Sequence, residues 1–70
     1  MAVRYNKLWK LLVDKKMSKA DLRRQADISS NTMTKLNRDE MVAMPILDRI
    51  CETLDVDYGE IVEHVHSNED

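Results

Sequence analysis

The chain has 70 residues, of which 43% are hydrophobic and 34% charged, with a formal net charge of −2. This length allows one small domain over residues 1–70, and the apolar fraction excludes a disordered tail. A core of this size leaves no room for an enzyme with a large buried site, and no serine, cysteine or carboxylate stands in a sequence typical of catalysis.

The near-neutral total conceals a separation of charge along the chain. Residues 1–38 hold ten Lys or Arg and three Asp, a net of +7, whereas residues 39–70 hold ten acids and one base, a net of −9. Residues 1–38, with their net positive charge, are therefore the part that we expect to bind an anionic partner. The sequence pI of about 5.6, taken alone, would argue against nucleic acid.

Compartment and cofactors follow from a few residues. Cys51 has no partner for an intramolecular disulfide, no basic and apolar leader opens the chain, and no apolar run approaches the roughly 20 residues of a membrane span. We expect a cytoplasmic protein with Cys51 as a small buried hydrophobe. His64 and His66 lack further ligands nearby in the sequence, so we expect no metal and no cofactor.

Apolar spacing and capping residues predict an all-α domain of four helices and a short last element. The expected ranges are 5–16, 19–26, 29–37, 45–54 and 58–63, with a frayed tail over 67–70. Ser18 with Asp21 forms a capping pair for the second helix, and Asp27 suits a left-handed turn residue after it. Ser29 or Ser30 caps the third helix.

The last element is ambiguous between a helix and a strand. Asp57 and Glu60 form another cap-like pair, which favours a helix. Ile61, Glu63 and Val65 alternate as in a strand, and Val3 offers a partner for such a strand near the other end of the chain.

The third helix has an unusual outward face. It carries short hydrogen-bonding side chains and one cation, and no acid stands between Ile28 and Arg38. If this helix stood alone in the sequence, its polar face would be interpreted as an ordinary solvent-exposed surface. After a capped helix and a short turn, however, the pattern is typical of a helix-turn-helix.

At this point the sequence resembles the small Cro/cI-type (lambda-repressor-like, XRE-family) bacterial transcriptional regulators. The resemblance lies in residues 18–36, SKADLRRQADISSNTMTKL, followed by residues 45–57, PILDRICETLDVD. It implies a five-helix lambda-repressor-like fold with the third helix in the major groove of double-stranded DNA. It also implies a homodimer on a pseudo-palindromic operator.

The resemblance assigns roles to particular side chains. Base contacts would come from Ser30, Asn31, Thr34 and Lys35. Phosphate contacts would come from Lys19, Ser29, Thr32, Asn37 and Arg38. Apart from the resemblance, we expect the dimer interface to lie on the fourth helix and the C-terminal element, with Tyr58, Ile61, Val62 and Val65 as candidates. No small-molecule effector is expected, because the chain has no room for a separate ligand-binding domain.

The chain also departs from the family pattern. Asp27 stands where the turn usually has Gly, and Arg23 where a small Ala is common. Leu12 and Asn37 replace an Arg–Glu pair of several relatives, and two acids (residues 39 and 40) follow the third helix. Such a chain could instead be a protein-interaction module, such as the antitoxin partner of a toxin, with the acidic half binding a basic partner.

Overall fold

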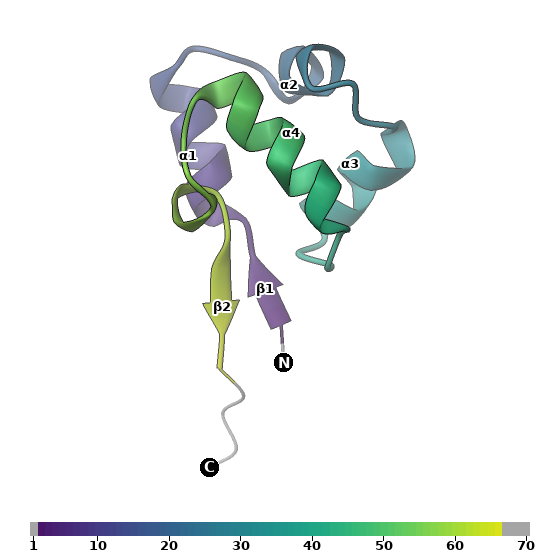
Figure 1. Cartoon of the computed structure of the whole chain (residues 1–70), viewed down its shortest axis with the longest axis vertical. Coiled ribbons are helices and arrows are strands. Elements are labelled where there is room, and N and C mark those ends of the chain that lie inside the picture. The colour runs from purple at the N-terminus through teal and green to yellow at the C-terminus, as the bar shows by residue number, and fades with distance from the viewer. Residues whose placement is uncertain (1, 67–70) are drawn as a thin grey trace.

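The structure is a computed structural model that describes residues 2–66. It is mostly helical, with four α-helices, one 3₁₀ turn and a pair of short strands (Figure 1). In chain order the elements are β1 (Ala2–Arg4), α1 (Asn6–Asp14), α2 (Lys19–Gln25), α3 (Ser30–Asn37), α4 (Met44–Leu54), η1 (Tyr58–Glu60) and β2 (Glu63–Val65). The four longer helices begin and end within two residues of their predicted ranges.

The predicted count of five helices is not confirmed. Where a helix was expected over residues 58–63, Asp57 and Glu60 do form a capping box, but the helix they start is a single 3₁₀ turn. The chain then extends into β2, so the strand alternative holds for Glu63 to Val65. The predicted fraying of residues 67–70 lies outside the described residues.

A two-stranded sheet joins the two ends of the described chain. β1 and β2 run antiparallel, with Val3 opposite His64 and Arg4 opposite Glu63. Figure 1 shows the two strands side by side below the helices. The expected pairing of Val3 with a C-terminal strand is confirmed.

Left-handed residues end the helices in place of glycine. Lys16, Asp27, Asp39 and Asp55 have φ angles of 55–57°, each at or shortly after the end of a helix. Asp tolerates this conformation better than most residues because its short side chain can hydrogen-bond locally. The prediction of a left-handed Asp27 is therefore confirmed, and the missing glycine does not disturb the turn.

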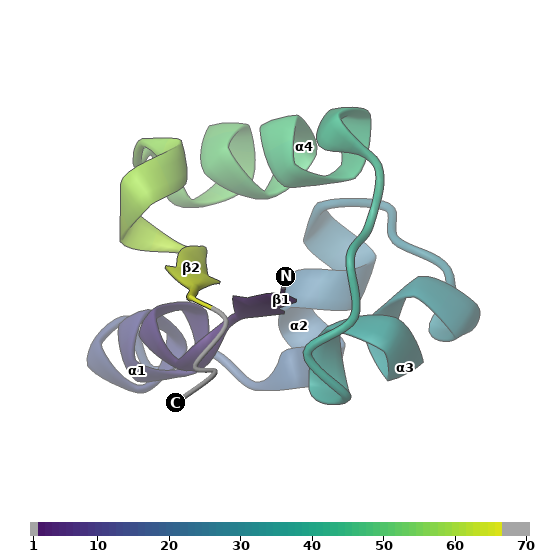
Figure 2. The ribbon, with the colours of Figure 1, turned by 90° about the horizontal axis from the view of Figure 1, so that it is seen from below.

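The core lies between α4 and the other three helices, which Figure 2 shows on opposite sides of the molecule. Every helix contributes to it, as the apolar spacing predicted. Its buried members are Tyr5, Leu8, Leu12, Leu22, Ala26, Ile28, Met33, Leu36, Leu47, Ile50, Leu54 and Ile61. The inward residues of α2 and α3 belong to this one core, which holds the two helices in place relative to each other.

Candidate nucleic-acid interface

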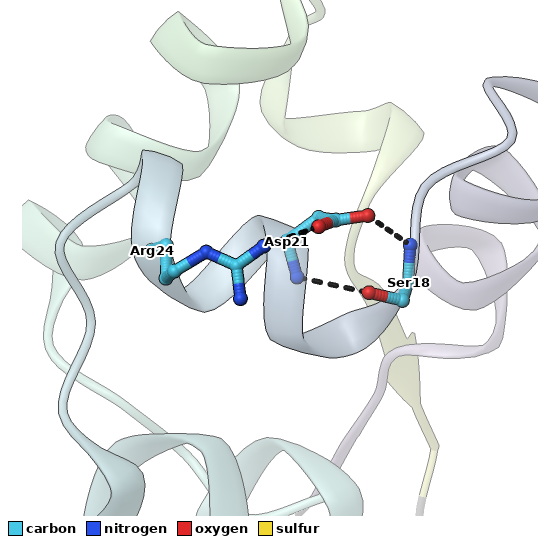
Figure 3. A network of polar contacts seen from close by, with 3 residues as sticks. All are labelled: Ser18, Asp21 and Arg24. Atoms are coloured by element: carbon cyan, nitrogen blue, oxygen red, sulfur yellow. Dashed lines mark hydrogen bonds and ion pairs between the residues drawn. The ribbon is translucent and has the colours of Figure 1, made fainter.

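The start of α2 is fixed by a reciprocal cap (Figure 3). The Ser18 hydroxyl accepts a hydrogen bond from the Asp21 N–H at 3.0 Å, and the Ser18 N–H donates to Asp21 Oδ2 at 3.1 Å. Arg24 holds the other carboxylate oxygen at 2.6 Å. Hydrogen bonds from Ser18 lower the pKa of Asp21 below its ordinary value. The cap therefore works with a charged Asp21, and its prediction from the sequence is confirmed.

The turn between α2 and α3 is closed from both sides. Ile28 is only 3% exposed, so its side chain anchors the turn in the core. On the outer side, Arg49 Nη1 of α4 donates to the Asp27 carbonyl oxygen at 2.8 Å. Sequence reasoning missed this role, because Arg49 stood out only as the single base of the acidic half.

Ser29 begins α3. Its hydroxyl accepts from the Thr32 N–H at 3.1 Å and donates to Thr32 Oγ1 at 3.0 Å. This decides between the two predicted caps in favour of Ser29. The two hydroxyl groups therefore form one polar cluster at the N-terminal end of α3.

The predicted base-contact residues lie together on the exposed face of α3. Met33 and Leu36 point into the core, which turns the four polar side chains outward. Thr34 Oγ1 donates to the Ser30 carbonyl oxygen at 3.0 Å, so its hydroxyl hydrogen is already used. Within residues 2–66, Asn31 and Lys35 make no side-chain hydrogen bond, which leaves their donors available to a ligand.

A second polar cluster lies at the C-terminal end of α3. Lys19 Nζ donates to Asn37 Oδ1 at 2.7 Å, joining the first turn of α2 to the last turn of α3. The same ammonium lies 4.2 Å from the centroid of the Trp9 ring on α1. The predicted phosphate-contact residues are thus divided between the two ends of α3, with Arg38 just beyond the second cluster.

The two acids that follow α3 have structural partners. The Tyr5 N–H donates to Asp39 Oδ1 at 3.1 Å, and the Tyr5 hydroxyl donates to the Glu40 carbonyl oxygen at 2.8 Å. Glu40 also lies 3.9 Å from Arg38, a contact between exposed groups that contributes little. Asp39 therefore fixes the chain reversal after α3, a role that its charge alone did not predict.

Negative charge is concentrated on α4 and the segment that follows it. Residues 44–60 hold five acids and one base, Arg49. Burial and the nearby acids, with Asp57 and Asp48 foremost, raise the pKa of the Cys51 thiol. Burial and the charge of Asp48 likewise raise the pKa of the Tyr58 phenol. An anionic ligand therefore meets repulsion on this side of the molecule.

The predicted dimer-interface residues are not equivalent. Tyr58 is 37% exposed, while Val62 and Val65 are half-buried. Ile61 is fully buried in the core of its own chain, so its side chain has no surface to offer a second copy. This burial argues against the expected role of Ile61 at an interface. Alternation along the chain marked the residue as apolar without showing which neighbour covers it.

In the part of the chain that the structure describes, no three His, Cys, Asp or Glu side chains converge to hold a metal ion. Between residues 2 and 66 no helix has both the length and the apolar character needed to cross a bilayer.

Comparisons with known proteins agree with this geometry. Residues 7–67 match the family model of the Cro/C1-type HTH DNA-binding domain. Among solved structures, the chain is similar to the transcriptional regulator VanUg, with 47% sequence identity and a TM-score of 0.87 over 89% of this chain and 83% of that one. Among curated proteins no match was found. The chain belongs to the family of Cro/C1-type helix-turn-helix DNA-binding domains.

Proposed function

We propose that the chain, as a single domain over residues 1–70, is a sequence-specific transcriptional regulator that binds double-stranded DNA with α3 in the major groove. One observation carries this proposal above the others. The outward face of α3 is free of acids and presents unengaged donors, and a polar cluster stands at each of its ends. A helix that reads bases needs this arrangement, because backbone contacts on both sides fix its register in the groove.

The base contacts would come from four side chains with different capacities. Asn31 can bond to adenine N6 and N7 together, and Lys35 can donate to guanine O6 or N7. Ser30 offers a hydroxyl that accepts and donates. Thr34, whose hydroxyl hydrogen bonds to the Ser30 carbonyl, would offer its methyl group and its oxygen lone pairs.

The phosphate contacts would flank these bases. Ser29 and Thr32 would bind at the N-terminal end of α3, where free backbone N–H groups also favour an anion. Lys19, Asn37 and Arg38 would bind at the other end. Arg38 is 71% exposed at its side chain, so its weak contact with Glu40 is easily exchanged for a phosphate.

A homodimer would bring two such helices to one operator. Half-sites about 34–36 Å apart allow two identical domains to meet successive turns of the major groove on one face of the duplex. Tyr58, Val62 and Val65 remain the candidates for the contact between copies, since they leave apolar surface exposed near β2. Two weak half-sites together give an affinity that one small domain cannot reach.

The test is a selection of bound fragments from genomic DNA, followed by affinity measurements over a range of salt concentrations. Asn31→Ala should cost about 1–3 kcal/mol of discrimination at one base position. Lys19→Ala should weaken binding to every sequence and lower the salt slope by about 0.9. Asn6→Ala, an exposed asparagine at the start of α1, is the matched control and should change neither quantity.

Binding of no fragment above random DNA at moderate salt would refute the proposal. The interpretation as a protein-interaction module would then be favoured, and the acidic surface of residues 44–60 would be the first place to look for a partner.

A further inference from the structure

The ring of Trp9 contacts Lys19, one of the predicted phosphate-contact residues. Its centroid lies 4.2 Å from Lys19 Nζ, within the range in which a ring face attracts an ammonium group. The ring is partly buried against the core cluster, so its position is set by the fold. Lys19 itself is exposed. The long, flexible side chain of Lys19 therefore rests with its ammonium group against a ring whose position is fixed by the fold.

Asn37 holds the same ammonium from the side, and this contact orients its amide. Because Lys19 can only donate, the oxygen of the Asn37 amide must face it, at 2.7 Å. The NH₂ group of Asn37 then points away from Lys19. Lys19 keeps N–H groups beyond the one given to Asn37, so these two adjacent, exposed side chains both retain donors for a ligand.

We propose that Trp9 is a positioning residue for binding the DNA backbone: its ring holds the Lys19 ammonium beside Asn37, so that the pair presents its donors to a single phosphate group of the duplex. This inference rests on the proposed function and extends it to a residue of α1 outside the helix-turn-helix.

The contact with Trp9 favours DNA binding because it orders the Lys19 side chain before the DNA binds. A lysine side chain loses rotamer freedom when it is fixed on a phosphate, and this loss weakens binding. Two contacts within the protein remove part of that loss in advance. The charge of Lys19 does not depend on Trp9, so loss of the ring should weaken binding while the number of counterions released stays the same.

The test is a double-mutant cycle on the full chain with a selected DNA fragment, using Trp9→Leu, Lys19→Met and the double variant. Trp9→Leu should weaken binding about two- to fivefold with an unchanged salt slope. Lys19→Met should lower the slope by about 0.9. In the Lys19→Met background, Trp9→Leu should have no further effect. Trp9→Phe keeps an aromatic ring in the core and should give an intermediate loss, and it replaces Leu in the cycle if Trp9→Leu does not fold.

An equal loss in both backgrounds would show that Trp9 acts only through the fold and would overturn the proposal. The contact itself is tested without DNA by proton NMR, where the ring of Trp9 should shift the terminal CH₂ protons of Lys19 upfield. Signals at their ordinary position would also overturn it, while DNA binding could still stand. Conversely, a shifted Lys19 signal in a protein that binds no DNA would refute the proposed function and leave only the contact.

Discussion

The hydroxyl of Tyr5 should anchor the loop after α3, and Tyr5→Phe tests this role. Tyr5 is 1% exposed, and its hydroxyl donates to the Glu40 carbonyl oxygen at 2.8 Å. The variant keeps the buried ring and loses the polar contacts of the hydroxyl, of which the bond to Glu40 is the one with hydrogen-bond geometry. Because Glu40 is exposed, water can solvate its carbonyl in the variant, so the loss should be close to the net value of one hydrogen bond, about 1 kcal/mol.

For a domain of this length, that loss corresponds to a fall in Tm of about 4–8 °C. Thermal unfolding followed by far-UV circular dichroism measures it. Tyr58→Phe is the matched control, because its hydroxyl lies 3.4 Å from Asp48 in an exposed setting and its removal should change stability by less than about 0.5 kcal/mol. Equal Tm values for wild type and Tyr5→Phe would refute the claim that this bond anchors the loop.

Tyr5→Phe should also change how the stability of the domain depends on pH above 10. Burial, with the negative charge of Asp39, raises the pKa of Tyr5 above its ordinary value of 10.0. The neutral phenol is thus favoured in the folded state, and its contribution is complete below pH 10 and lost as the pH rises above it. Wild type should lose stability in that range faster than Tyr5→Phe. Parallel curves of stability against pH would contradict the burial of a titrating Tyr5.

Three further predictions concern residues outside the DNA-binding face. Lys16→Gly should stabilise the domain by about 0.5–1 kcal/mol, because Lys16 has a φ of 57°, which glycine adopts without steric cost. Lys15→Gly, at a φ of −90°, should instead destabilise the domain. If urea unfolding showed that both variants stabilise the domain, or that both destabilise it, the backbone conformation of these residues would be contradicted. The Cys51 thiol should react with a disulfide reagent at neutral pH more slowly than a free cysteine, since burial and the neighbouring acids raise its pKa; equal rates would show that it is open to solvent. Stability should fall as the pH drops below 3.8 because hydrogen bonds from Ser18 lower the pKa of Asp21, and Asp21→Asn should reduce this acid dependence; an unchanged acid profile would argue against the charged cap.

The elements that the sequence predicted well are those specified by local chemistry. Ser18 and Asp21 are three residues apart, and their cap depends on nothing else in the chain. Asp27 could be assigned a left-handed conformation because an Asp after the last inward residue of a helix has few alternatives. The outward face of α3 was predictable because the inward positions, Met33 and Leu36, set its orientation.

The features that were missed depend on contacts between distant segments. Arg49 reaches the Asp27 carbonyl across 22 residues, and Tyr5 reaches Asp39 across 34. No spacing rule signals such pairs. Ile61 was assigned to an interface for a related reason: an apolar residue near a chain end looks the same in the sequence whether its own core or a second copy covers it.

The last element shows a competition between two local signals. The Asp57 and Glu60 cap was correctly identified, but a cap fixes where a helix begins and not how long it continues. Pairing of β2 with β1 satisfies the backbone groups of residues 63–65 better than an isolated short helix near the chain end would.

We expect α3 and Lys19 to face the duplex, while the acidic segment of residues 44–60 faces away from it. The most direct measurement is an NMR titration of the labelled protein with a selected DNA fragment. The largest amide and side-chain shifts should fall on Lys19 and on residues 29–38, while residues 48–60 should change little. Shifts centred on residues 48–60, with α3 unaffected, would contradict it.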